Sequence, residues 1–234
     1  PRGAANRLVE KERLATMGEL AAQLAHELRN PIVAIGANLE SLVRDPELCE
    51  DHRSVLSAVR REVVRMDMLL KDHLAARHDL SFAEVDVGAA LAEAAGVLEG
   101  AFRSAGKNLS VHCAPGLRTL GDHDALKHVL FNLLLNALEA SFPGGEVTCS
   151  ASADERTVTL AIEDRGPGLA VPAEELFRPF FTTKKNGTGL GLTVCRKITK
   201  AHGGAMTLAN REGGGCRATV VLPRRRAAGN GARA

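Results

Sequence analysis

The chain contains no tryptophan and no tyrosine, and aromatic residues make up only 3% of its 234 positions. So few flat rings leave little material for the stacking surfaces with which proteins bind single-stranded nucleic acids. The 30 lysines and arginines are nearly balanced by 28 aspartates and glutamates, for a formal net charge of +2. Because nucleic-acid binding depends on concentrated positive charge, we expect no nucleic-acid partner.

Long hydrophobic runs and paired cysteines are absent as well. No run approaches the roughly 18 uninterrupted hydrophobic residues of a membrane span, and no N-terminal stretch has the form of a signal peptide. The five cysteines are far apart and include no C-x-x-C pair, which is typical of reduced thiols in the cytoplasm. Because the chain begins at Pro1, we expect a fragment of a longer protein, with any sensory or membrane-attached region upstream.

Residues 1–79 carry the pattern of a helical hairpin. Hydrophobic residues recur every three or four positions over residues 6–43, stop at Arg44-Asp45-Pro46, and resume over residues 47–78. Two antiparallel helices cannot enclose these hydrophobic stripes alone, whereas two copies complete a four-helix bundle. We therefore expect a homodimer through this region, with cover by the second domain as the alternative. A linker is expected over residues 77–84.

Residues 80–223 alternate between helical and strand patterns. The expected helices span residues 87–102, 121–141 and 191–202, and the expected strands span residues 109–113, 147–152, 156–162, 205–210 and 216–222. A long irregular loop is expected between Gly166 and Gly191. Strands separated by helices give a two-layer α/β sandwich, so the chain as a whole is predicted to be an α+β protein. The Arg-, Gly- and Ala-rich tail over residues 224–234 is predicted to be disordered.

His26 is the first candidate for chemistry. At about 100° per residue it is rotated roughly 200° from both Leu24 and Leu28, so its imidazole points away from the hydrophobic seam. A neutral imidazole is nucleophilic near physiological pH, and the adjacent Glu27 can accept a proton or orient the ring. Asn30 lies at i+4, on the same helix face. The alternative is an ordinary surface histidine on a bundle helix.

Asn132 and Asn136 form the second candidate. They lie at i and i+4, on one face of an otherwise hydrophobic helix. Amide oxygens that face a pocket can ligate Mg²⁺ that is held mainly by phosphates. Either residue alone is equally well explained as a capping or buried hydrogen-bonding amide, but the pair favours the metal.

The third candidate is the block Asp164-Arg165-Gly166-Pro167-Gly168, directly after an expected strand. A carboxylate at a strand end can accept a hydrogen bond from an exocyclic amine, and the glycines let the backbone approach a flat base. Alone, the pattern is equally typical of an ordinary turn.

A phenylalanine-rich loop and a glycine-rich block follow. Residues 177–185 hold three of the seven phenylalanines, which suits a loop that is anchored and also moves, and end on Lys184 and Lys185, which offer positive charge to a phosphate. Residues 187–192 read Gly-Thr-Gly-Leu-Gly-Leu and lead into a helix N-terminus, which favours anions. The block is neither a Walker loop, because no G-K-[ST] follows, nor a convincing dinucleotide fingerprint.

In this order, the blocks H-E-L-R-N-P, N-x-x-x-N, D-x-G-x-G, F-x-x-F-F and G-T-G-L-G-L resemble the sensor histidine kinases of bacterial two-component systems. The resemblance covers residues 8–223 and implies a dimerisation and histidine-phosphotransfer domain followed by an ATP-binding domain of the GHKL type. Cytoplasmic location of this part follows from the same resemblance. The short loop after Phe181 is similar to that of the nitrogen-regulation type of kinase.

The resemblance also implies residue roles. His26 matches the phosphoacceptor, Glu27 the proton acceptor and Asn30 the residue that positions water during dephosphorylation of the partner. Asn132 and Asn136 match the Mg²⁺ site, and Asp164 the adenine-binding aspartate. The remaining residues expected to bind ATP are Gly166, Gly168, Thr182, Thr183, Lys184, Lys185, Gly187, Thr188, Gly189, Leu190, Gly191 and Leu192.

The activity implied is autophosphorylation of His26 from ATP, followed by transfer of the phosphoryl group to an aspartate in the receiver domain of a response regulator, with dephosphorylation of that partner as a second activity. Three places depart from the family pattern. Glu139 stands where many members carry Lys, and Thr182 where a phosphate-directed Arg is common. Lys184 or Lys185 can replace one of those charges. Cys216 and Ala218, after the late glycine block, stand where Thr and Phe are common.

Two other functions compete with the kinase. A GHKL ATPase of the gyrase, Hsp90 or MutL kind carries a Glu at the position of Asn132, and an amide cannot act as a general base there. A non-catalytic, kinase-like phosphorelay scaffold is the second, and the intact Asp164, Gly166 and Gly168 argue against it.

Overall fold

The computed structural model describes residues 80–184 and 189–225, together with separate positions between residues 31 and 66. The chain divides into two compact units, Pro1–His78 and Asp79–Ala234. Within the first unit, the described positions of residues 31–43 and 52–66 are helical, as predicted. Leu48 and Cys49 are not helical, so the second helix begins later than the predicted residue 47. His26, Glu27, Asn30 and the predicted break at residues 44–46 lie outside the described residues.

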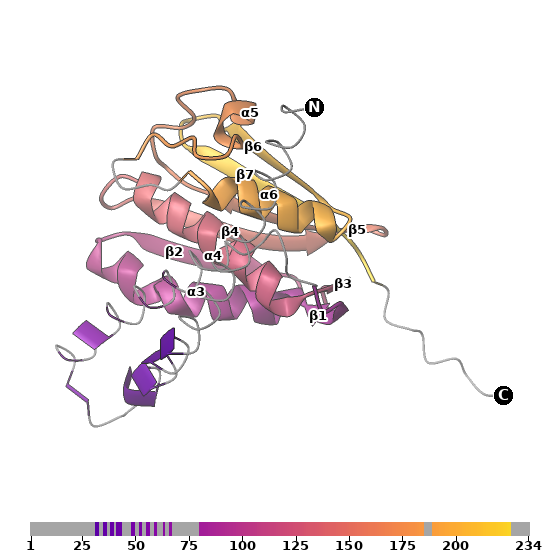
Figure 1. Cartoon of the computed structure of the whole chain (residues 1–234). Helices are drawn as coiled ribbons and strands as arrows, with labels where there is room; N and C mark the ends of the chain where they lie inside the picture. Colours follow the sequence, from indigo (N-terminus) through magenta and orange to yellow (C-terminus); the bar gives the residue numbers. More distant parts are fainter. Residues whose placement is uncertain are drawn as a thin grey trace, which may run out of the picture. The chain divides into compact units, whose positions relative to one another are not determined.

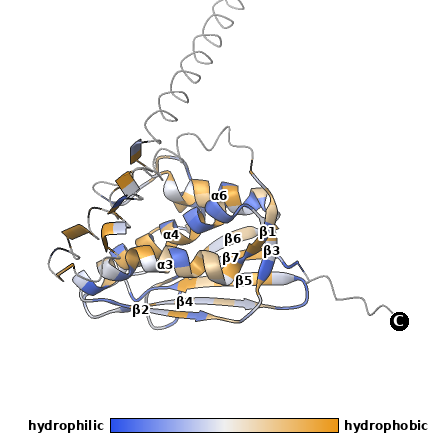
Figure 2. Ribbon diagram, turned by 90° about the horizontal axis from the view of Figure 1, so that it is seen from below, coloured by the Kyte–Doolittle hydropathy of each residue, from blue (hydrophilic) through white to orange (hydrophobic). Residues whose placement is uncertain are grey.

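The second unit is built on a five-stranded sheet (Figure 1). Its order is β2 (Asn108–Cys113), β4 (Glu146–Ala153), β5 (Thr157–Glu163), β7 (Cys216–Pro223) and β6 (Ala205–Asn210). The β2–β4 pair is parallel and the other pairs are antiparallel. Three helices, α3 (Val87–Ser104), α4 (His123–Ala140) and α6 (Gly191–Ala201), lie side by side on one face (Figures 1 and 2). The predicted two-layer α/β sandwich and the α+β class are confirmed.

The core lies between the two layers. Along β5, Val158, Leu160 and Ile162 are buried while the residues between them are not, which is the period of two expected for a sheet with one covered face. On α4, Leu130 and Leu134 are one turn apart and buried against this sheet. In β5 and α4, burial therefore follows the hydrophobic periodicity from which these elements were predicted.

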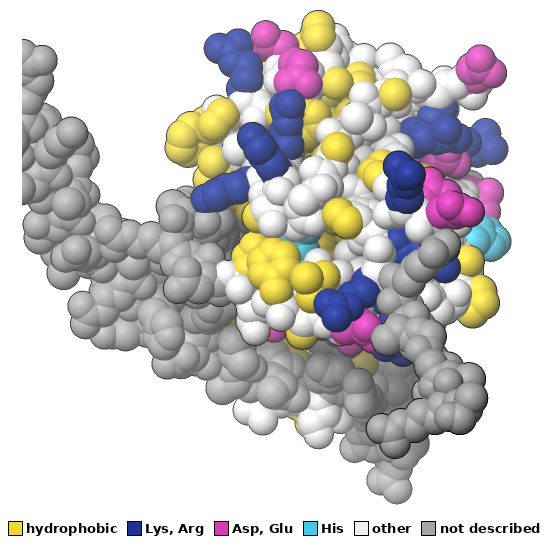
Figure 3. All heavy atoms as spheres, turned by 90° about the vertical axis from the view of Figure 1, so that its right-hand side faces the viewer, with side chains coloured by type: hydrophobic (Ala, Val, Ile, Leu, Met, Phe, Trp, Pro, Cys, Tyr) yellow, Lys and Arg dark blue, Asp and Glu magenta, His cyan; other side chains and the backbone are white. Residues whose placement is uncertain are grey.

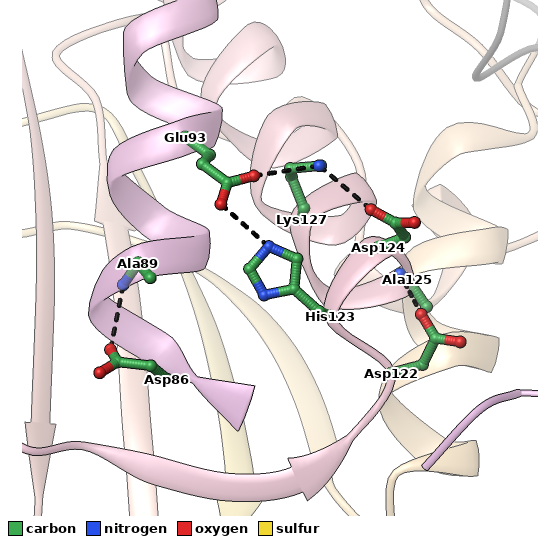
Figure 4. Close-up of polar contacts among 8 residues, drawn as sticks. All are labelled: Asp86, Ala89, Glu93, Asp122, His123, Asp124, Ala125 and Lys127. Carbon is green, nitrogen blue, oxygen red and sulfur yellow. Dashed lines mark hydrogen bonds and ion pairs between the residues drawn. The ribbon is translucent and has the colours of Figure 1, made fainter. Parts of the chain in front are cut away.

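Side-chain caps and an ion-pair cluster fix α3 and α4 relative to each other (Figure 4). Asp122 caps α4 by accepting from the backbone N–H of Ala125 at 2.9 Å, and Asp86 caps α3 in the same way. Between the helices, Glu93 is 3.1 Å from both His123 and Lys127. The caps satisfy an N–H group in the first turn of each helix, and the ion pairs connect α3 to α4, which carries the candidate site.

A separate two-stranded antiparallel sheet, β1 (Ala83–Asp86) and β3 (Arg118–Gly121), lies beside the main sheet. The predicted linker over residues 77–84 was wrong at its end, because Ala83 and Glu84 already pair with β3. Four-residue strands are too short to show a readable alternation. On the face that holds this small sheet, hydrophobic side chains gather near the centre and Lys and Arg side chains surround them (Figure 3).

Two further predictions need correction. The ordered chain continues past residue 223, since the N–H of Arg224 donates to Arg156 at 2.7 Å and that of Arg225 to Arg118 at 3.0 Å. Residues 226–234 lie outside the described residues. The predicted irregular loop also contains a short helix, α5 (Ala173–Leu176). In the described part of the chain, no helix combines the length and hydrophobicity that crossing a membrane requires.

Candidate functional site

Residues of the predicted blocks lie on helix α4 or pack against it. A Cβ atom at Gly166 would lie 2.3 Å from the carbonyl oxygen of Ala140, at the end of α4. A Cβ atom at Gly191, the first residue of α6, would lie 3.3 Å from Oδ1 of Asn132. Lys184 reaches Asn136 directly. Gly166, Lys184 and Gly191, which all follow α4 in the sequence, therefore lie along this helix.

Asp164 forms the buried end of the site, with only 5% of its surface exposed. Its Oδ1 atom accepts hydrogen bonds from the backbone N–H groups of Gly166 at 2.8 Å and Cys216 at 3.1 Å. No described residue donates to Oδ2. The carboxylate is thus fixed by one oxygen, and the other is available to a hydrogen-bond donor on a ligand.

The glycines around Asp164 make its loop compact. Gly166 and Gly215 have no room for a side chain, because a Cβ atom would lie 2.3 Å and 2.0 Å from the carbonyl oxygens of Ala140 and Asp164. Gly168 adopts a φ of +79°, which disfavours any residue with a Cβ. The D-x-G-x-G pattern therefore reflects close backbone packing rather than an ordinary turn.

Two residues that the sequence analysis missed hold this loop. Asn210, at the end of β6, accepts from the backbone N–H of Leu169 at 2.6 Å through its Oδ1 atom. Arg211 donates to the carbonyl oxygen of Asp164 at 2.7 Å. Both partners lie more than 40 residues away in sequence, and no local pattern points to them.

Asn132 and Asn136 lie one turn apart on α4, as predicted. The Nδ2 atom of Asn132 is buried without a hydrogen-bond partner among the described residues. An unsatisfied buried amide costs about 1–3 kcal/mol, so the site favours a ligand that completes its hydrogen bonding. Rotation of the amide by 180° exchanges its oxygen and nitrogen, so the same position suits either an anion or a cation.

These amides fit a hard cation such as Mg²⁺, which prefers oxygen ligands and retains bonds to substrate phosphates. The described residues include no cluster of three or more His, Cys, Asp or Glu side chains that can hold a metal. A cation in this part of the chain therefore needs phosphate oxygens in addition to the amides.

Of the two predicted lysines, Lys184 reaches α4. Its Nζ atom donates to Oδ1 of Asn136 at 2.6 Å and also pairs with Glu139, one turn further along the helix. The Oγ1 atom of Thr182 accepts from the backbone N–H of Lys184 at 3.1 Å, and Thr183 is exposed. Lys185, Gly187 and Thr188 lie outside the described residues.

The phenylalanines of the loop do not share one role. Phe177 is buried, with the guanidinium of Arg196 4.6 Å from its ring centroid and its carbonyl oxygen bonded to Oγ1 of Thr193 at 3.1 Å. Phe180 is 75% exposed and has a φ of 64°. The expectation of hydrophobic anchors is therefore met by Phe177, and Phe180 does not act as one.

The N-terminus of α6 has the general properties that favour anions. The helix follows Gly189 and Leu190, includes Gly191 and Leu192, and begins without a side-chain cap. The N–H groups of a first helical turn have no partner within the helix, and the helix dipole adds positive potential there. Asp164 thus offers a hydrogen-bond acceptor, and the start of α6 offers backbone N–H groups and positive potential.

Two protein-family models match the chain, and the first of them ends next to the boundary between the two compact units. The model described as "His Kinase A (phospho-acceptor) domain" matches residues 16–79. The model described as "Histidine kinase-, DNA gyrase B-, and HSP90-like ATPase" matches residues 121–226, which include all of the blocks on α4, β5 and α6.

Individual proteins agree with these models. The signal transduction histidine-protein kinase AtoS of Escherichia coli (strain K12) is 32% identical over 223 residues, which are 93% of this chain and 36% of AtoS. The chain thus spans well under half the length of this relative.

Among solved structures, the nucleotide-free catalytic domain of histidine kinase ThkA is 32% identical with a TM-score of 0.57, over 62% of this chain and 96% of that domain. ThkA in complex with the response regulator protein TrrA matches 92% of this chain and 64% of its own chain, with 30% identity and a TM-score of 0.59. Full-length ShkA in complex with AMPPNP matches 89% of this chain and 46% of its own, with 27% identity and a TM-score of 0.63.

Proposed function

This chain belongs to the sensor histidine kinases of two-component systems, and we propose that it transfers the γ-phosphoryl group of ATP to His26 and from there to an aspartate of a response regulator. The observation that carries the proposal is the convergence on α4 of a buried acceptor at Asp164, an unsatisfied amide at Asn132 and a lysine at Lys184. His26 falls within the stretch that matches the phospho-acceptor model.

Each part of the site has a separate task in binding ATP. Oδ2 of Asp164 accepts from the exocyclic amine of adenine, and the N–H groups at the start of α6 bind phosphate oxygens. Asn132 and Asn136 hold Mg²⁺, a cation that neutralises phosphate charge and orients the terminal phosphoryl group. Binding of AMPPNP by the related ShkA supports an adenine nucleotide as the ligand.

The chemical step moves one phosphoryl group. An imidazole nitrogen of His26 attacks the γ-phosphorus, the bond from that phosphorus to the bridging oxygen breaks, and ADP leaves. Glu27 accepts the proton that the imidazole releases as the N–P bond forms. The phosphoryl group then passes to a carboxylate oxygen of the receiver domain. The N–P bond breaks in this step, and the imidazole takes up a proton and returns to its neutral form.

The proposed partners follow from the first unit and from the related complex. Several large hydrophobic side chains of the described helical positions are exposed, namely Ile35, Leu42, Val55, Val59 and Met66. A second copy covers such a surface in a four-helix bundle, which supports a homodimer through residues 1–79. The structure of ThkA with TrrA supports a response regulator as the second partner. We place this part of the protein in the cytoplasm, where ATP and receiver domains are found.

The decisive experiment uses γ-labelled ATP. Wild type should acquire an acid-labile, base-stable label, and His26→Ala should acquire none. His52→Ala, which removes an exposed histidine from the same unit, is the matched control and should be labelled like wild type. Label that persists in His26→Ala would refute the assignment. ATP turnover without a phosphoprotein would favour the GHKL hydrolase, and failure to bind ATP–Mg²⁺ would favour the non-catalytic scaffold.

A second experiment separates phosphatase activity from kinase activity. We propose that Asn30 positions the water that hydrolyses the phospho-aspartate of the partner. Asn30→Ala should then keep autophosphorylation at the wild-type rate and slow loss of phosphate from the regulator. Loss of autophosphorylation instead would show that Asn30 serves the kinase reaction.

A further inference from the structure

Glu139 has no part in the binding roles assigned above, yet it lies at the edge of the proposed metal site. It follows Asn136 by three residues, so both side chains project from the same face of α4. The ammonium of Lys184, 45 residues further along the chain, contacts both of them. One cation is therefore shared between an amide oxygen and a carboxylate.

The ammonium of Lys184 occupies a position that a metal also needs. Its Nζ atom is 2.6 Å from Oδ1 of Asn136, whereas Mg²⁺ binds oxygen ligands at roughly 2.0–2.1 Å. Two cations at these distances from a single oxygen repel each other strongly. Asn136 therefore binds either Lys184 or Mg²⁺.

We propose, on the premise of the proposed function, that Glu139 is a positioning residue that holds Lys184 on Asn136 in the nucleotide-free chain, so that the Mg²⁺–nucleotide complex binds only by displacing this ammonium. The carboxylate of Glu139 opposes nucleotide binding in two ways. It stabilises the nucleotide-free arrangement, and it repels the phosphates once they arrive. Both effects weaken nucleotide binding, so removing the charge of Glu139 increases the affinity for the nucleotide.

The size of the effect is limited by solvent. The side chains of Glu139 and Lys184 are 46% and 43% exposed, and ion pairs at that exposure are weak. We expect a change of about three- to fivefold in binding rather than a loss or gain of function.

Calorimetric titration with ADP at a series of Mg²⁺ concentrations tests the proposal. Glu139→Gln should lower both the dissociation constant and the half-saturating Mg²⁺ concentration by about three- to fivefold. Glu99→Gln, which breaks an exposed pair with Arg103 on α3, is the matched control and should bind like wild type. In a Lys184→Gln background the gain from Glu139→Gln should shrink, because there is no ammonium to release.

Tryptic cleavage after Lys184 provides a second measurement that needs no nucleotide. In the nucleotide-free chain, Glu139→Gln should be cleaved there about three- to fivefold faster than wild type or Glu99→Gln, because the lysine side chain is no longer held on α4. Equal cleavage, or equal or weaker Mg²⁺–ADP binding by Glu139→Gln, would overturn the inference. Wild type that binds no Mg²⁺–ADP, with cleavage accelerated as expected, would instead overturn the proposed function.

Discussion

The backbone N–H of Phe180 donates to the carbonyl oxygen of Gly189 at 3.0 Å, and both residues have positive φ angles, of 64° and 68°. Phe180 is the one non-glycine residue with a positive φ in the described part of the chain. A Cβ atom at Gly189 would lie 2.4 Å from the carbonyl carbon of Phe180. The two ends of the segment that carries Lys184 therefore cross in backbone contact at Phe180 and Gly189. Only glycine fits at position 189 of this crossing.

Replacing Gly189 tests this crossing. Gly189→Ala should reduce nucleotide affinity about tenfold or more, since a strained backbone costs about 1–3 kcal/mol and the segment must move to relieve it. The melting temperature should change little because Thr182, Thr183 and Lys184 of this segment are exposed. Gly96→Ala is the control: nothing lies within 4 Å of its Cβ position on α3, so binding should be unchanged and stability should rise by up to about 1 kcal/mol.

Asp164 allows binding and stability to be separated. Asp164→Asn keeps an Oδ1 acceptor for Gly166 and Cys216 but replaces Oδ2 with a donor, so adenine-nucleotide affinity should fall about 10- to 100-fold with the fold intact. Asp164→Ala leaves both N–H groups without that acceptor and should also lower the free energy of unfolding by about 1–3 kcal/mol. Calorimetry and urea unfolding measure the two effects. Wild-type affinity in Asp164→Asn would contradict the adenine role.

The ion-pair cluster on α3 and α4 predicts a pH dependence of stability. Burial raises the pKa of Glu93, but hydrogen bonds from Lys127 and His123 outweigh it and leave the pKa below the usual 4.5. A carboxylate with a lowered pKa contributes stability above its unfolded pKa and loses it as the pH falls further. Urea unfolding between pH 3 and 6 should therefore show a shallower acid decline in Glu93→Gln than in wild type. The difference should stay below about 1 kcal/mol because the pair is half exposed.

Thiol reactivity should divide the cysteines into two groups. Burial raises the pKa of Cys149 to about 12 and that of Cys216 to about 11, so both remain thiols at neutral pH. Cys149 and Cys195 are buried and Cys216 is partly buried, whereas Cys49 and Cys113 are exposed. Labelling of the native protein at pH 8 should modify the two exposed cysteines first, and all five only in denaturant. Rapid native labelling of Cys149 would show that the sheet opens at β4.

Much of the fold could be predicted from the sequence because many of its helices and strands are long. Helix α4 has 18 residues and β4 has eight, so the periods of 3.6 and 2 repeat often enough to be recognised. The paired strands β1 and β3 have four residues each, and the added pairing of Arg224 and Arg225 has no local signal. These pairings were missed because they depend on a distant strand and not on their own pattern.

The sequence by itself determined which chemistry this protein can carry: the order of its motifs, the i, i+4 spacing of Asn132 and Asn136, and the glycines around Asp164. Only the tertiary structure decided that Lys184 reaches α4, and which backbone groups surround the aspartate. The partners concerned are 48 residues apart for Lys184 and Asn136, and 52 apart for Asp164 and Cys216. Sheet register and helix packing set these contacts, because hydrogen bonds over such separations depend on where whole elements dock rather than on neighbouring residues.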